Sequence, residues 1–232
     1  MSFSLRLLAV LIALLEVAFV LFGDPSDLRL YRSVHLLEMV SLIAIVAVTA
    51  PASRGTLIIL LALASAFLGD IVNSKLIDFS AIYSQQVLLS IPFFLLTHLL
   101  YLGLFTQRLR KNLVFRVVAA LICVAVLVQL FGPDVGLLAM VGLAVYGVIL
   151  LSMAFMALPF LGEANPAPLV ALGACVFVVS DCLISATLFS GLQRTMAIDS
   201  AIWLTYIYAQ ICISCVLMLP PRANAANQEA VL

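Results

Sequence analysis

Residues 56–73 read TLIILLALASAFLGDIVN, an apolar run in which Asp70 is the only charged side chain. A helix needs about 20 mostly apolar residues to cross the hydrocarbon core of a bilayer. An aspartate in such a run costs about 2.5–3.5 kcal/mol on insertion scales, so it usually faces a bundle interior and has a function there. The run GACVFVVSDCLIS at residues 173–185 places Asp181 in the same setting. These two aspartates are the strongest pointer to function in the sequence.

The composition of the whole chain agrees with a lipid environment. Of its 232 residues, 66% are hydrophobic and 9% are charged, whereas soluble domains average about 45–50% apolar and about 25% charged residues. The net charge is zero and there is no basic block, so nothing indicates a nucleic-acid partner. The sequence predicts an integral membrane protein.

Proline, glycine and charge clusters divide the chain into predicted spans. These runs are longer than barrel strands and do not alternate, so they predict helices. The fold class is therefore all-α, a polytopic bundle of about eight transmembrane helices in one domain over residues 1–221, followed by a flexible polar tail at 222–232. The predicted spans are 5–22, 33–50, 56–73, 83–106, 113–131, 136–158, 167–190 and 199–219.

The first of these spans could be a signal peptide, but Glu16 interrupts it and no small-residue cleavage site follows, so we interpret it as a retained helix. Eight spans place both termini on one side of the membrane. Seven lysine and arginine residues fall on that side and four on the other, which predicts cytoplasmic termini in a bacterial inner (plasma) membrane.

Asp70 and Asp181 each lie 14 residues past the start of their predicted spans, which is roughly 21 Å along a helix axis. Because the two spans run in the same direction, we expect the carboxyl groups at matching depth. Several polar residues fall near that depth or one step from it, although each could equally be an interfacial or packing residue. They are Glu38, His98, Tyr101, Tyr146, Tyr206 and Gln210.

Other chemistry has little support in the sequence. No metalloprotease, Walker or dinucleotide-binding motif occurs, and the two histidines fall in different spans. We therefore predict no cofactor and no metal site, although the residue types alone leave a carboxylate site for Mg²⁺ or Ca²⁺ open. Ser65 and Ser180, and the pair Cys212 and Cys215, are interpreted as small residues that pack helices together.

Five segments in order carry a resemblance to a known family: SAFLGD, PFFLLTHLLYLGLF, VYGVILLSMAFMA, GACVFVVSDCLIS and TYIYAQICIS. From the second span onward the chain resembles the lysoplasmalogenase (YhhN-like) family of membrane hydrolases. The resemblance implies an eight-helix enzyme that cleaves the vinyl ether bond of lysoplasmalogens. The products are a fatty aldehyde and glycerophosphoethanolamine or glycerophosphocholine.

The family's motif residues match this chain at Gly69-Asp70, Ser180-Asp181, His98, Tyr101, Tyr206 and Gln210. Two positions depart from the family pattern. His35-Leu36 stands where members often have Lys-Pro, and Asn73-Ser74-Lys75 stands where members usually continue with apolar residues. Both departures lie near the expected head-group end, so they bear on substrate preference more than on the fold.

Hydrolysis of a vinyl ether requires an acid that protonates carbon. A carboxyl group that is buried beside a second carboxyl group favours its protonated form, while the partner stays ionised, and glycosidases divide the work between two carboxyl groups in this way. Asp70 and Asp181 are thus the candidate catalytic pair, and the bulky neighbours of Asp70 make it the weakly preferred acid. For the phosphate head group the candidate cations are Arg32, Lys75, Arg194 and the side chain of His35.

Two other functions remain open at the level of the residues. A proton- or cation-coupled transporter of small molecules or lipids would use the same intramembrane aspartates. A non-catalytic lipid-binding protein would use them to hold helices together. The expected partners are a lysophospholipid substrate and membrane lipids, and the sequence does not determine an oligomeric state.

Overall fold

The computed structural model describes residues 3–22, 28–74, 76–77, 86–108, 114, 117–121, 124–125, 137–189 and 191–219. Seven helices in this part of the chain are long and apolar enough to cross a membrane. The predicted fold class, an all-α polytopic membrane bundle, is therefore confirmed. The elements are α1 (Phe3–Phe22), α2 (Leu28–Thr49), α3 (Arg54–Asn73), α4 (Gln86–Arg108), α6 (Leu137–Ala157), the short 3-10 helix η1 (Leu158–Gly162), α7 (Ala167–Phe189), α8 (Met196–Ser214) and the 3-10 helix η2 (Cys215–Met218).

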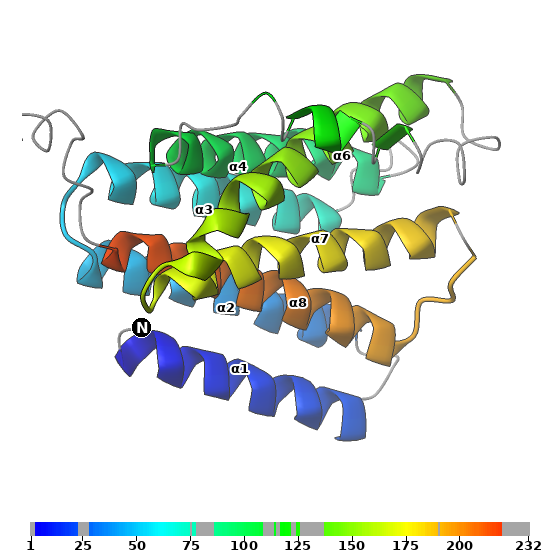
Figure 1. The fold of residues 1–232 in the computed structure, drawn as a ribbon. Helices are drawn as coiled ribbons and strands as arrows, with labels where there is room; N and C mark the ends of the chain where they lie inside the picture. The colour runs from blue at the N-terminus through cyan, green and yellow to red at the C-terminus, as the bar shows by residue number, and fades with distance from the viewer. Residues whose placement is uncertain are drawn as a thin grey trace, which may run out of the picture.

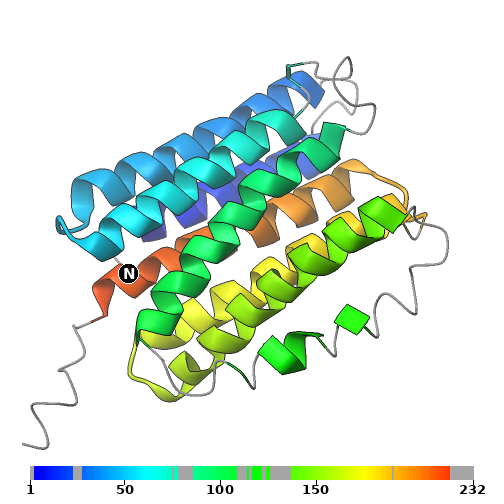
Figure 2. The ribbon, with the colours of Figure 1, turned by 90° about the horizontal axis from the view of Figure 1, so that it is seen from above.

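The helices form one bundle in which α1 lies at the edge, against α2 and α8 (Figure 1). Helix α1 begins and α8 ends at the same end of the bundle in both views (Figure 2). Helices α4 and α6 run in the same direction (Figures 1 and 2). Most of the predicted span 113–131 lies outside the described residues. The residues of this span that the structure does describe are helical: 114, 117–121 and 124–125.

The predicted spans and the observed helices differ most at the start of α2. The helix begins at Leu28 instead of residue 33, so Tyr31 and Arg32 belong to the helix and not to the preceding loop. The reason is that Leu28, Leu30 and Tyr31 continue the apolar pattern, and Tyr31 is only 2% exposed. This extension brings one more turn of α2 to the candidate site. The predicted tail, 222–232, lies outside the described residues.

Apolar side chains cover the outside of the bundle and polar groups are collected inside it. Leu14, Leu57 and Val48 are more than half exposed, which suits contact with lipid chains. By contrast, Glu16 and His98 are fully buried. In hydrocarbon a polar side chain is stabilised only by partners within the protein, so the polar interior must be internally hydrogen-bonded.

Glycines and small hydroxyl residues hold the site-bearing helices at close range. A Cβ atom on Gly173 of α7 would lie 2.7 Å from Cβ of Cys212 and 2.9 Å from the carbonyl oxygen of Ala209, both on α8. Ser180 donates a hydrogen bond of 3.0 Å to the carbonyl of Ile202 across the same contact. Ser65 of α3 donates one of 2.8 Å to Phe93 of α4. These residues pack helices, as predicted.

Candidate active site

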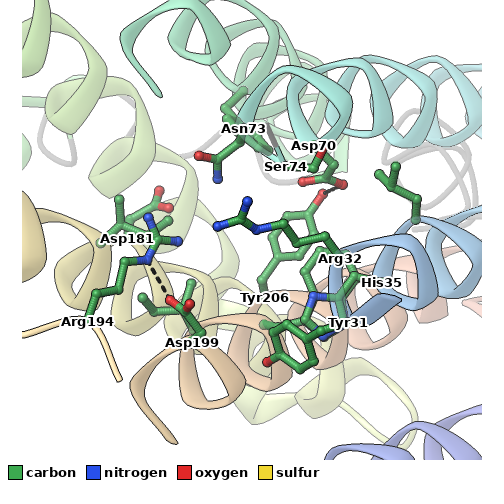
Figure 3. Close-up of a pocket in the computed structure, with 15 residues that line it drawn as sticks. Tyr31, Arg32, His35, Asp70, Asn73, Ser74, Asp181, Arg194, Asp199 and Tyr206 are labelled. Carbon is green, nitrogen blue, oxygen red and sulfur yellow. Dashed lines mark hydrogen bonds and ion pairs between the residues drawn. The ribbon is translucent and has the colours of Figure 1, made fainter. Parts of the chain in front are cut away.

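Asp70 of α3 and Asp181 of α7 line one cavity of about 80 Å³. Helices α2, α4 and α8 and the segment before α8 complete its walls. Figure 3 shows the two carboxyl groups on either side of this space. The expected convergence of the two aspartates is therefore present in the structure. The other lining residues are Tyr31, Arg32, His35, Leu36, Asn73, Ser74, Phe94, Ile184, Arg194, Asp199, Ile202, Trp203 and Tyr206.

The carboxyl group of Asp70 is held by a tyrosine of α8. The hydroxyl of Tyr206 donates to Oδ2 of Asp70 over 2.7 Å, and Asp70 is 7% exposed. Phe94 of α4 packs edge-on against Tyr206, with ring centroids 6.0 Å apart. A Cβ atom on Gly69 would lie 3.0 Å from the Phe94 ring. Glycine before Asp70 thus lets an aromatic wall close over the carboxyl group.

Asp181 is held in the same manner by a tyrosine of α6. The hydroxyl of Tyr146 donates to Oδ2 of Asp181 over 2.7 Å. His98 of α4 approaches the same oxygen, with Nε2 at 3.8 Å. Each aspartate therefore has its own tyrosine donor, but only Asp181 has an imidazole beside it among the described residues.

The hydrogen bonding of His98 fixes which ring nitrogen faces Asp181. Nδ1 lies 2.5 Å from the carbonyl oxygen of Phe94, and a carbonyl can only accept, so Nδ1 carries a proton. In a neutral ring Nε2 is then a lone pair, and it has no hydrogen-bond partner although it is buried. A lone pair and an ionised carboxylate repel each other. The two atoms are 3.8 Å apart, too far for a hydrogen bond, and a proton on either the ring or the carboxyl group would remove this repulsion.

Tyr101 and Gln210 form a separate pair deeper in the bundle. The hydroxyl of Tyr101 donates to Oε1 of Gln210, and both side chains are fully buried. Neither residue lines the cavity. Gln210 lies one helical turn from Tyr206 on α8 and interacts with its side chain, so these two predicted site residues lie behind Tyr206 and do not face the cavity.

Two guanidinium groups reach the cavity from opposite sides. Arg194 forms an ion pair of 2.5 Å with Asp199. Arg32 comes from α2, and its guanidinium lies between Asp70 and Asp181 in the view of Figure 3. It interacts electrostatically with Arg194 and Asp199, and no carboxylate within the described part of the chain forms an ion pair with it. Three carboxyl groups line the same cavity, and one of them, Asp199, is already paired with Arg194; Arg32 is therefore the guanidinium better placed to meet an anionic group of a ligand. Lys75 lies outside the described residues.

A second cavity of about 60 Å³ meets the first at Asp181. Asn73, Phe94 and Ile184 also belong to both cavities. The remaining lining comes from α4, α6 and α7 and is mostly apolar: Ser90, Ile91, Leu143, Tyr146, Ser185 and Leu188. Asp181 therefore stands where a polar space adjoins an apolar one.

A buried polar cluster from α1, α2 and α8 backs the wall of the first cavity. His35 stacks on Trp203, with ring centroids 4.3 Å apart at 8°. Nε2 of His35 lies 2.7 Å from Oε1 of Glu16. Trp203 donates to Glu38 over 2.5 Å, so Glu38 lies behind the wall and does not line the cavity. Sequence reasoning identified His35 and Glu38 but treated Glu16 only as an interruption of the first span.

Tyr31, Asn73, Asp199 and Trp203 also line the cavity, and sequence reasoning did not select them. Tyr31 and Trp203 resemble the interfacial aromatics of any membrane helix, and only their packing against His35 distinguishes them. In the part of the chain that the structure describes, no group of three or more His, Cys, Asp or Glu side chains lies close enough to hold a metal ion.

Comparison with known proteins gives one match. The model of the YhhN family matches residues 31–217, which is most of the chain and includes both aspartates and their tyrosine partners. No curated protein and no solved structure matches.

Proposed function

Because the chain belongs to the YhhN family, we propose that it is a membrane-embedded hydrolase that cleaves the vinyl ether bond of lysoplasmalogens. The products are a fatty aldehyde and glycerophosphoethanolamine or glycerophosphocholine. The observation that carries the proposal is the convergence of Asp70 and Asp181 on one cavity among membrane-spanning helices. Two carboxyl groups on one cavity are what acid-catalysed hydrolysis through an oxocarbenium ion needs.

Asp181 is the proton donor in this proposal, because the lone pair of His98 Nε2, 3.8 Å from its Oδ2, disfavours the ionised carboxylate. The geometry thus favours Asp181 as the acid. In the sequence, the bulky neighbours of Asp70 favour Asp70 for this role. Asp181 protonates the β-carbon of the vinyl ether, whose π electrons form the new C–H bond. The oxocarbenium ion that results is stabilised by ionised Asp70, whose hydrogen bond from Tyr206 suits a carboxylate.

Water then attacks the oxocarbenium carbon and loses a proton to Asp70. The hemiacetal collapses as its hydroxyl proton returns to Asp181 and its C–O bond to glycerol breaks. Asp70 gives its proton to the leaving glycerol oxygen. One water molecule is consumed, and both aspartates end in their starting states, so the cycle needs no cofactor.

The two cavities give the substrate an orientation. Arg32 and Arg194 at the polar cavity suit a phosphate group, for which guanidinium is a favoured partner. The apolar cavity between α4, α6 and α7 suits the start of the alkenyl chain. A molecule lying across both would bring its vinyl ether to Asp181, where the cavities meet.

The transporter alternative has less support from the helices. Secondary transporters commonly build midplane sites from discontinuous helices. Helices α3 and α7, which carry the two aspartates, run without a break from Arg54 to Asn73 and from Ala167 to Phe189.

The test is release of aldehyde from a lysoplasmalogen by the detergent-purified protein. We expect Asp181→Asn to lower kcat by about 10²- to 10⁴-fold, the usual contribution of a general acid, and Asp70→Asn to lower it as well. Glu163→Gln is the matched control, since Glu163 lies in the turn between η1 and α7, away from both cavities. In D₂O, the aldehyde, trapped by reduction as it forms, should carry one deuterium at the former β-carbon.

Full activity of Asp181→Asn would reject its role as the acid. Absence of aldehyde release by the wild-type protein, together with proton-coupled uptake of a solute into liposomes, would reject hydrolysis in favour of transport.

A further inference from the structure

Glu16 of α1 is a fully buried carboxyl group that accepts hydrogen bonds from two residues of the cavity wall. Nε2 of His35 is 2.7 Å from its Oε1, and the hydroxyl of Tyr31 donates to its Oε2 over 3.2 Å. Tyr31 also pairs with Ser200 of α8 at 2.8 Å. Glu16 therefore ties α1 to both α2 and α8 through residues that line the cavity or adjoin its wall.

These contacts determine how the His35 ring meets the cavity. Glu16 engages Nε2, and the ring is fixed between Trp203, stacked at 4.3 Å, and Tyr31, edge-on at 4.0 Å. No hydrogen bond to Nδ1 occurs among the described residues, and because Nε2 donates to the carboxylate, Nδ1 of the neutral ring carries a lone pair that can accept a hydrogen bond from a molecule in the cavity. A carboxylate that binds one imidazole nitrogen sets the orientation and the proton of the other, as in catalytic triads and metal sites.

Glu16 lies outside residues 31–217, the part of the chain that matches the family. We propose that Glu16 is a positioning residue for head-group binding, which holds His35 so that Nδ1 accepts a hydrogen bond from the glycerol hydroxyl of the substrate, beside Arg32 and Arg194. This proposal rests on the proposed function for the identity of the ligand. It assigns to α1, a helix at the edge of the bundle, a part in substrate recognition.

The experiment measures two quantities for the full-length protein in detergent. One is the Kd for a 1-O-alkyl lysophosphocholine, which has the head group but no vinyl double bond and cannot be hydrolysed by carbon protonation. The other is the KM and kcat for the lysoplasmalogen. We expect Glu16→Gln to raise Kd and KM by about 10-fold, the order of one hydrogen bond, with kcat changed less than 2-fold.

Tyr208→Phe is the matched control. Tyr208 of α8 donates to the carbonyl of Ala9 in α1 over 2.5 Å and does not line the cavity. The substitution thus removes one hydrogen bond between α1 and α8 and leaves the contacts of His35 unchanged, so we expect Kd and KM to stay at wild-type values. His35→Leu should raise Kd as Glu16→Gln does, and the double variant should be no worse than either single one, because both act through the same ring.

Equal effects of Tyr208→Phe and Glu16→Gln, or additive effects of Glu16→Gln and His35→Leu, would overturn the proposal, since α1 would then act only as a support. Wild-type Kd and KM for folded Glu16→Gln would overturn it too. A wild-type protein that binds the alkyl lipid but releases no aldehyde would reject hydrolysis alone, and the Kd comparison would still decide the role of Glu16.

Discussion

Each aspartate of the cavity receives its hydrogen bond from a tyrosine on a different helix. Tyr206 donates to Asp70 and Tyr146 donates to Asp181, both over 2.7 Å. The difference between the two carboxyl groups is His98, whose Nε2 is 3.8 Å from Asp181. The two aspartates thus have similar tyrosine hydrogen bonds and differ in one neighbour, His98, on which their different proposed roles depend.

The role of His98 can be separated from its structural bond to α4. In His98→Asn the amide nitrogen can take the place of Nδ1 and donate to the carbonyl of Phe94, but nothing takes the place of Nε2. We expect kcat for aldehyde release to fall by about 10- to 100-fold, equivalent to about 1.4–2.7 kcal/mol, because Asp181 loses the neighbour that favours its protonated form, while KM stays near its wild-type value. Single-turnover kinetics measure the step directly.

His98→Gln serves as the comparison, because its amide lies nearer the position of Nε2. Wild-type kcat for His98→Asn, with an unchanged melting temperature, would show that this ring does not favour the protonated form of Asp181.

Sequence reasoning succeeded at the residue scale where spacing along one helix was enough. The equal offsets of Asp70 and Asp181 within their spans predicted that they meet, and both do line one cavity. Glu16 could not be assigned in this way. Its partners Tyr31 and His35 lie on the next helix, so its role depends on how α1 packs against α2 and α8, which spacing in the sequence does not specify.

Helices α7 and α8 each carry a part of the site, and they approach each other closely at Gly173. Helix α7 supplies Asp181, and α8 supplies Tyr206, the donor to Asp70. Any side chain at Gly173 would meet the backbone of α8, with Ala209 O at 2.9 Å and Ile213 N at 3.0 Å. Backbone atoms cannot rotate away, so the helices themselves would have to separate.

We therefore expect Gly173→Ala to destabilise the protein by about 1–3 kcal/mol, the usual cost of overpacking. Thermal unfolding in detergent measures this, and aldehyde release should fall as well because Tyr206 moves away from Asp70. Gly142→Ala on α6 is the control, because a Cβ atom there would meet nothing within 4 Å. Equal melting temperatures for the two variants would contradict this account of the α7–α8 contact.

The boundaries of the helices were predictable where apolar runs end in proline, glycine or charge. The start of α3 is an example: Ser53 caps the helix by accepting a hydrogen bond from the backbone N–H of Thr56. The start of α2 was placed too late, because Arg29 and Arg32 resemble a charged loop. Their helix forms because Tyr31, between them, is buried against Glu16 and Ser200.

The whole molecule is a bundle with apolar residues outside and a polar interior that opens into two adjoining cavities. The apolar cavity lies between α4, α6 and α7, so its occupant is set by the packing of three helices. If it receives the alkenyl chain, its size should influence which substrates are cleaved.

Ser185→Phe would place an aromatic ring on the wall of this cavity. We expect KM to rise more for long-chain than for short-chain lysoplasmalogens, because a filled cavity excludes the longer chain first. Val179→Phe, on the same helix but 50% exposed on its outer surface, is the control. Equal changes for all chain lengths would place the alkenyl chain elsewhere.

The junction of the two cavities at Asp181 has a consequence for turnover. If the protein cleaves lysoplasmalogens as proposed, its products differ in solubility: the aldehyde partitions into hydrocarbon, and the glycerophosphodiester dissolves in water. With the bond broken at the boundary, each fragment already occupies the compartment that matches its polarity, so the two can depart independently. Inhibition by added glycerophosphocholine should then be insensitive to the length of the aldehyde.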